Sequence, residues 1–171
     1  MFEGFSLHLS EVSFFVVLIE LVVAVYFDLT TAKFPNKFFL LFSCINILLV
    51  SILGGWSALT VGLLTLGVAV LLMVPVYMIR MLGGGDIKLI LAISPILLLD
   101  EFIGFLLMSF VWAAVFGFLR SAIGGSVRSL LVNTLFLTKK VTVASERIPF
   151  TVGILLGWCS YRSVMALGVF S

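Results

Sequence analysis

The chain is poor in charged residues, cysteines and prolines, and each shortage excludes a class of protein. Only 11% of its 171 residues are charged, whereas 63% are hydrophobic, and its mean hydropathy is +1.35. Soluble domains carry about 25% charged residues. Two cysteines exclude a disulfide framework and a cysteine-rich metal site, and four prolines leave no proline-rich linker. We therefore expect one all-α, polytopic membrane domain over residues 1–171.

The first segment lacks the basic region of a cleaved signal peptide, so we expect it to be a retained helix. A spanning helix needs about 20 mostly apolar residues, and the sequence offers six candidates of roughly this kind. The fourth is short for a spanning helix. The candidates are Ser10–Phe27, Phe38–Leu53, Leu59–Ile79 with Pro75 near its end, Ile87–Leu99, Phe102–Leu119 and Pro149 to about Val169.

Basic residues are missing from one side of this arrangement. If the amino terminus lies outside and each segment crosses once, all ten basic residues except Arg162 fall on the cytoplasmic side, as the positive-inside rule requires. Asp28 and Asp86 then both lie at cytoplasmic helix ends. The inner set is Lys33, Lys37, Arg80, Lys88, Arg120, Arg128, Lys139, Lys140 and Arg147.

We interpret the basic residues as topology signals that touch anionic lipid headgroups. No aromatic residues are interleaved with them as in a nucleic-acid site, so no nucleic-acid partner is expected. The stretch at about 120–147 is too polar to span. It is expected to form a cytoplasmic loop with an interfacial amphipathic helix.

Three consecutive glycines, Gly83, Gly84 and Gly85, precede Asp86 between two apolar segments. Each glycine inside a helix costs about 1 kcal/mol relative to alanine, and a charge inside the bilayer costs more. A functional turn is therefore expected, with positive φ angles that let an extended substrate approach the backbone. Asp86 would open the next helix, where the helix dipole favours its ionised form.

A second aspartate, Asp28, ends the first apolar run. A polar turn follows, and Pro35 lies near the first position of the next helix, where proline is tolerated. Alone, this is an ordinary inter-helix loop. Two neighbouring carboxyls, however, share one proton and hydrolyse peptides by activating water and polarising the scissile carbonyl.

These two sites together resemble the type IV prepilin peptidases, the bacterial branch of the membrane-embedded GxGD aspartyl proteases. That family has an aspartate seven residues before the proline of an (Ile/Leu)-Pro-(Asn/Asp) string, and a later Gly-x-Gly-Asp-x-Lys. The present counterparts are Asp28 to Pro35-Asn36, with Phe34 in place of Ile or Leu, and Gly83 to Lys88. A weaker similarity is the Ile148-Pro149-Phe150 string, followed by a Gly153-x-x-x-Gly157 step that allows close helix packing.

The resemblance implies Asp28 and Asp86 as catalytic residues, without a cofactor or metal. It implies a bacterial inner-membrane enzyme that cuts a prepilin or pseudopilin on the cytoplasmic side, after a short basic leader and before a hydrophobic helix. Because Cys-x-x-Cys pairs are missing, it resembles the short form of Flp/tight-adherence systems, which cleaves without methylating. Site-shaping residues would be Gly83, Gly84, Gly85, Lys88, Pro35 and Asn36.

Other interpretations remain open at this point. A small proton-coupled transporter would also use membrane carboxyls such as Glu20 and a broken helix, but near the midplane. A non-catalytic assembly subunit would leave both aspartates dispensable, and a signal-peptide-peptidase type is a further protease alternative. Glu20 lies about 12 Å deeper than Asp28 along a helix, where a supporting structural role is favoured. Arg162 is expected to snorkel or to pair with a carboxyl.

Overall fold

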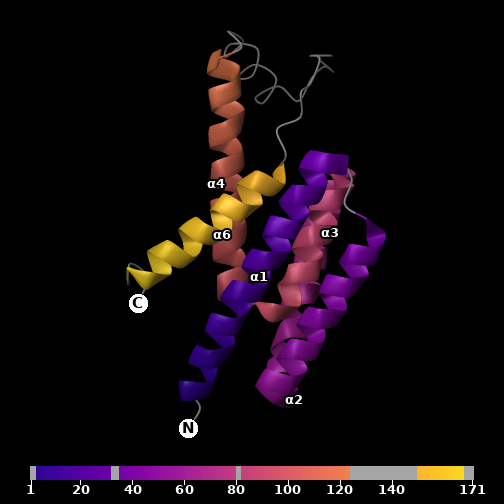
Figure 1. The fold of residues 1–171 in the computed structure, drawn as a ribbon, viewed down its shortest axis with the longest axis vertical. Coiled ribbons are helices and arrows are strands. Elements are labelled where there is room, and N and C mark those ends of the chain that lie inside the picture. Colours follow the sequence, from indigo (N-terminus) through magenta and orange to yellow (C-terminus); the bar gives the residue numbers. More distant parts are fainter. Residues whose placement is uncertain (1–2, 32–34, 80–81, 124–149, 168–171) are drawn as a thin grey trace.

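The computed structural model describes residues 3–31, 35–79, 82–123 and 150–167. Within these ranges every regular element is a helix, so the expected all-α class is confirmed (Figure 1). The expected interfacial helix lies outside the described residues, and the first residues of the expected loop, 120–123, belong to α4. The elements are α1 (Glu3–Thr31), α2 (Asn36–Met78), α3 (Gly84–Ile93), the 3₁₀ helix η1 (Ser94–Ile96), α4 (Leu99–Ile123) and α6 (Phe150–Ala166).

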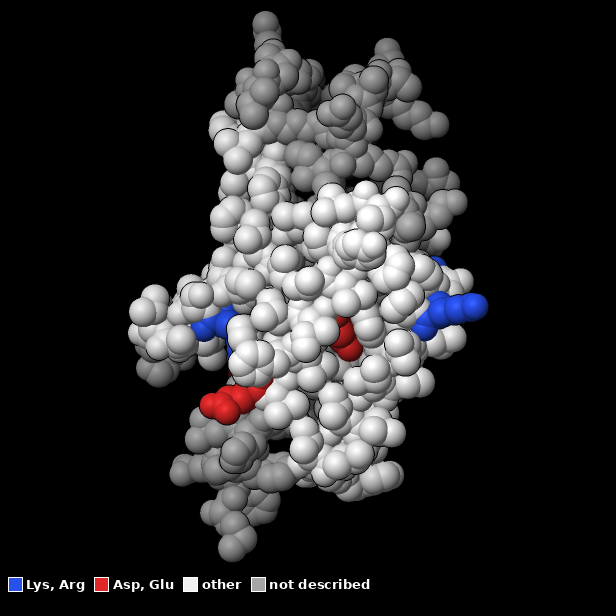
Figure 2. All heavy atoms as spheres, in the orientation of Figure 1, with Lys and Arg blue, Asp and Glu red and all other residues white. Residues whose placement is uncertain are grey.

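Three of these helices are long and apolar enough to cross a membrane. The qualifying stretches are Glu11–Thr30, Asn36–Met78 and Leu99–Leu119. Figure 2 shows one face of the molecule on which charged atoms occur only at isolated points among uncharged ones. Such a surface is suited to lipid rather than water.

Helix α2 folds back on itself. A straight helix of its 43 residues would be about 65 Å long. Instead, Gly55 interrupts it with a φ of 63° and a ψ of −163°, a conformation open to glycine. Both ends of α2 then reach the start of α3: Asn36 binds Lys88, and the Tyr77 ring lies beside Gly84. The fold thus contains two antiparallel arms, which correspond to the second and third segments expected from the sequence.

Helix α3 begins three residues earlier than predicted and ends six residues earlier, at Ile93. Pro95 explains the end, because its ring cannot continue a regular α-helix. The chain passes through η1 instead. The Pro95 carbonyl sits so close to Gly62, in the second arm of α2, that a Cβ there would collide with it. The short helix is therefore embedded between the arms of α2.

A buried polar cluster joins three helices below the carboxyl end of α1. The Asn46 amide donates to Glu20 Oε2 at 3.0 Å and to the Ala92 carbonyl at 2.9 Å. Asn46 is fully buried and Glu20 is nearly so. Buried polar groups are tolerated when hydrogen-bonded. Glu20 thus links α1 to α2, which agrees with the supporting role favoured above.

Helix α6 packs tightly and antiparallel against α4. A Cβ at Gly157 would lie 2.6 Å from the Ser109 backbone, whereas one at Gly153 would lie 3.6 Å from the Ala113 nitrogen. Further along, Gly104 of α4 faces the Tyr161 ring. Small residues allow this close approach. The Gly-x-x-x-Gly step therefore serves packing within the chain.

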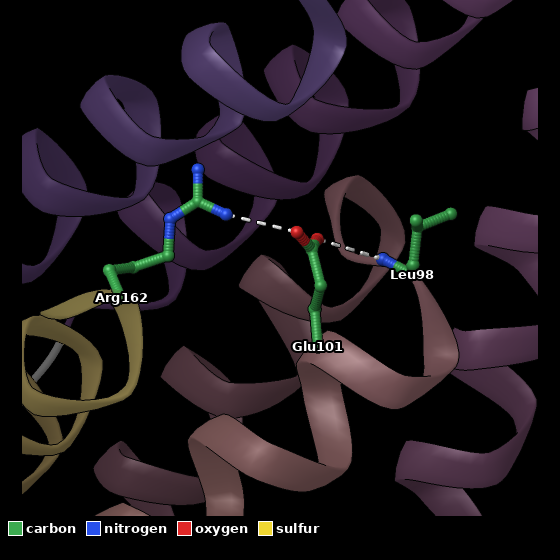
Figure 3. A network of polar contacts seen from close by, with 3 residues as sticks. All are labelled: Leu98, Glu101 and Arg162. Atoms are coloured by element: carbon green, nitrogen blue, oxygen red, sulfur yellow. Dashed lines mark hydrogen bonds and ion pairs between the residues drawn. The ribbon is translucent and has the colours of Figure 1, made fainter. Parts of the chain in front are cut away.

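The far end of α6 is held by a partly buried ion pair (Figure 3). Arg162 Nη1 lies 3.0 Å from Glu101 Oε1, and Glu101 Oε2 accepts the Leu98 N–H at 3.3 Å. The guanidinium also lies over the rings of Phe14 and Trp158. The expected pairing of Arg162 with a carboxyl is thus confirmed, and it ties α6 to α4 and α1.

Breaking this pair is expected to destabilise the bundle. Arg162→Met should lower the free energy of unfolding by about 3 kcal/mol, because it leaves the Glu101 carboxylate buried and unpaired. Unfolding in mixed detergent micelles measures the loss. Combining it with Glu101→Gln should cost less than the sum of the two single changes. Strictly additive losses would show that the two side chains do not stabilise each other.

Candidate active site

The two aspartates singled out in the sequence meet at one end of the bundle. Asp28 lies in the last turn of α1 and Asp86 in the first turn of α3, and the structure places these helix ends together (Figure 1). Both side chains are half-buried. The Asp28 carboxyl is near enough to act electrostatically on Asp86. Two residues 58 positions apart in the sequence therefore share one site.

The pKa of Asp86 is raised to about 6, mainly because the carboxyl is buried and also because Asp28 is close, while a hydrogen bond from the Gly83 N–H opposes the rise. The expected effect of the helix amino terminus, which favours the ionised form, is therefore outweighed. A helix end contributes about 0.3–1 kcal/mol at exposed sites, which is less than the combined effect of desolvation and a like charge. The pKa of Asp86 therefore lies above the ordinary aspartate value, and its protonated form persists to higher pH than that of a free aspartate.

The glycine turn does not use positive φ angles, contrary to expectation. Gly83 is the N-cap of α3 with a φ of −67° and a ψ of 147°, and Gly84 and Gly85 already belong to the helix. The Asp86 carboxyl bends back onto the Gly83 N–H, as the acidic side chain at helix position N3 does in a capping box. A Cβ on Gly83 would lie 2.9 Å from Asp86 Oδ2. Glycine is needed here for close approach rather than for backbone conformation.

Lys88 of α3 and Asn36 of α2 bond to each other. Lys88 Nζ donates to Asn36 Oδ1 at 2.6 Å, so the lysine ties α3 to α2. Pro35 is the N-cap of α2, immediately before the predicted first position, and its carbonyl accepts the N–H of Phe38 at 3.1 Å. The bond between Lys88 and Asn36 therefore holds the start of α2 against the start of α3.

The sequence did not predict one hydrogen-bond partner of Asp28. Thr151 Oγ1, from the first turn of α6, donates to Asp28 Oδ2 at 2.7 Å. The Ile148-Pro149-Phe150 string had drawn attention to the start of this helix. It contains no signal for the hydroxyl, because only the packing of α6 on α1 directs Thr151 toward an aspartate.

The assembled groups suit acid–base chemistry on a water molecule. One carboxyl accepts a hydroxyl donor and the other has a raised pKa, and carboxyl pairs with such different surroundings are suited to act as base and acid. In the ranges that the structure describes, no three His, Cys, Asp or Glu side chains gather in one place.

A family model described as the type IV leader peptidase family matches residues 15–118, more than half of the chain. The matched segment contains Asp28, Asp86 and the glycine turn and ends before α6. No curated protein and no solved structure matches the chain.

Proposed function

Because the chain belongs to the type IV leader peptidase family, we propose that it is a membrane-embedded aspartic endopeptidase with Asp28 and Asp86 as its catalytic pair. The observation that carries this proposal is the meeting of the two carboxyls, from α1 and α3, at one end of the bundle. Family membership makes the protein a leader peptidase. The proximity of the two carboxyls supports the aspartic mechanism.

In the proposed reaction, ionised Asp28 takes a proton from a water molecule, whose oxygen attacks the scissile carbonyl carbon. Protonated Asp86 donates its proton to the carbonyl oxygen as the tetrahedral intermediate forms. Asp28 then gives its proton to the leaving nitrogen, the C–N bond breaks, and Asp86 recovers the proton from the collapsing intermediate. The raised pKa of Asp86 and the hydroxyl bonded to Asp28 support this division of roles.

The neighbouring residues shape the site in this proposal. Gly83 leaves room for the Asp86 carboxyl, and the side-chain-free turn at Gly84 and Gly85 leaves backbone accessible to an extended peptide. Lys88 and Asn36 hold the two sides of the site together. Pro35 limits the start of α2 to a single backbone geometry.

We further propose six membrane crossings, with the amino terminus outside and the active site facing the cytoplasm. The two arms of α2, the stretch from Ile87 through η1, and α6 supply crossings beyond those of α1 and α4. The placement of basic residues supports this orientation. At that depth water reaches the carboxyls, while the bundle lowers the dielectric around them.

The proposed substrate is a prepilin or pseudopilin of the Flp/tight-adherence type. Its short basic leader would approach the acidic pair from the cytoplasm, and its hydrophobic helix would remain in the lipid bilayer beside the enzyme. Neither Cys44 nor Cys159 belongs to a Cys-x-x-Cys pair, so we propose cleavage without methylation of the new amino terminus.

A cleavage assay in proteoliposomes tests the function. The purified protein should convert a prepilin that carries a short basic leader ending in glycine into its mature form, as read by gel and mass spectrometry. Its kcat/KM should fall as pH rises through about 6, because protonated Asp86 is then lost. Above that point, the expected loss is about tenfold for each pH unit.

Glu20→Gln serves as the control for this pH profile. This change removes the buried Glu20 carboxyl, which lies in α1 as Asp28 does. It keeps a side-chain oxygen that accepts a hydrogen bond from Asn46. The alkaline limb should stay in place in this variant. A limb that moves with Glu20→Gln would contradict the assignment to Asp86, and lack of any cleavage by the wild-type protein would contradict the function itself.

A further inference from the structure

The threonine at the start of α6 makes an unusual hydrogen bond for a helical threonine. Thr151 is 5% exposed, and its hydroxyl donates across to Asp28 Oδ2 at 2.7 Å. Threonines in helices commonly bond to a carbonyl of their own preceding turn. Thr30, Thr60 and Thr65 do so here. Thr151 instead links two helices whose bonded residues are 123 positions apart.

The chemistry of the bond favours a fixed carboxylate. An ionised carboxylate only accepts hydrogen bonds, and a hydroxyl bonded to it at this length is a charge-assisted, strong contact. A buried carboxylate without such donors would be costly. The hydroxyl therefore holds Asp28 Oδ2 toward α6. The other carboxylate oxygen, Oδ1, is then left to bind a water molecule.

The position of Thr151 is set by contacts along the whole of α6. Gly157 packs against the Ser109 backbone of α4. At the far end, Trp158 stacks on Phe14 of α1 with ring centroids 6.2 Å apart. Arg162 adds its ion pair with Glu101. Helix α6 is thus fixed to both neighbours, which holds the hydroxyl beside Asp28.

We propose that Thr151 is a positioning residue of the peptidase site, whose hydroxyl holds the Asp28 carboxylate in its working orientation toward Asp86 and water. This inference rests on the proposed function. It extends the site to a helix that lies beyond the matched segment, residues 15–118. The sixth helix then completes the active site in addition to packing against the bundle.

Isosteric variants of the full chain in proteoliposomes test the inference, with the same leader-bearing prepilin as substrate. Thr151→Val removes the hydroxyl and keeps the shape, and it should lower kcat by about 10- to 100-fold, the effect of losing one hydrogen bond to a charged group. KM should change little. Thr151→Ser restores the donor and should recover most of the rate. Thr65→Val is the matched control, because Thr65 is buried but bonds only to the Val61 carbonyl of its own helix.

The outcomes separate this inference from the function on which it rests. Loss of kcat in Thr151→Val with rescue by serine supports the positioning role. Equal rates in Thr151→Val and wild type overturn it while leaving the peptidase intact. Equal losses in Thr151→Val, Thr151→Ser and Thr65→Val also overturn it, since they indicate general damage to the bundle. A wild-type protein that does not cleave overturns the function first.

Discussion

Asp28→Asn and Asp86→Asn proteins are each expected to insert into the membrane and fail to remove the leader. The loss should be at least about 100-fold, because acid–base groups of this kind contribute 10²–10⁴ to a rate. Asparagine keeps the size of the side chain but cannot take or give a proton at neutral pH. One carboxyl acts as the base and the other as the acid, so each single variant lacks one of the two groups. The cleavage rate of a double variant should therefore be no lower than that of a single variant.

Co-expression of each variant with the prepilin, followed by separation of precursor and mature forms on a gel, measures the loss. Asp100→Asn is the matched control. Asp100 is an exposed aspartate at the opposite end of the bundle, in the first turn of α4, and its replacement should leave cleavage unchanged. Full processing by the Asp28→Asn protein would refute the catalytic pair.

Adding one methyl group to α6, at Gly157, is expected to lower both the stability of the protein and its cleavage rate. Gly157→Ala places a Cβ 2.6 Å from the Ser109 backbone, where no side-chain rotation relieves the clash. The variant should lose about 1–3 kcal/mol of stability, as overpacked cores do. Because α6 must move away from α4, Thr151 should leave Asp28, and the cleavage rate should fall with it.

Gly153→Ala provides the comparison one turn earlier on the same helix. Its Cβ would lie 3.6 Å from the nearest atom, an ordinary contact, and alanine favours a helix over glycine by about 1 kcal/mol. This variant should be at least as stable as wild type and should cleave normally. Thermal unfolding in detergent distinguishes the two, and equal stability of both variants would show that α6 does not pack as closely as the structure places it.

The helical segments and the pairing of the aspartates were predictable for simple reasons. Long apolar runs can satisfy their backbone polar groups only as helices, so composition alone predicts an all-helical chain. Counting segments places Asp28 and Asp86 at the same end, because each crossing reverses direction. The break at Gly55 was also implied by the gap between two apolar runs, although only the structure gives its geometry.

Local features were harder to predict because several forces compete at one residue. Asp86 shows this: the helix dipole was visible in the sequence, but the depth of burial and the distance to Asp28 were not. The glycine turn is a second case. A run of glycines indicates that side chains are not tolerated, yet the reason at Gly83 is the returning carboxyl of Asp86 rather than a positive φ angle.

The sequence by itself determined which segments become helices and which helix ends carry acidic groups. Apolar segments in a membrane must pair their own backbone polar groups, and charged side chains are costly inside the bilayer, so both follow from the order of the residues. Only the tertiary structure decided which faces of those helices meet. A helix that is apolar on all sides has no preferred rotation about its own axis, so the contact of Thr151 with Asp28, like that of Glu20 with Asn46, depends on how distant helices pack.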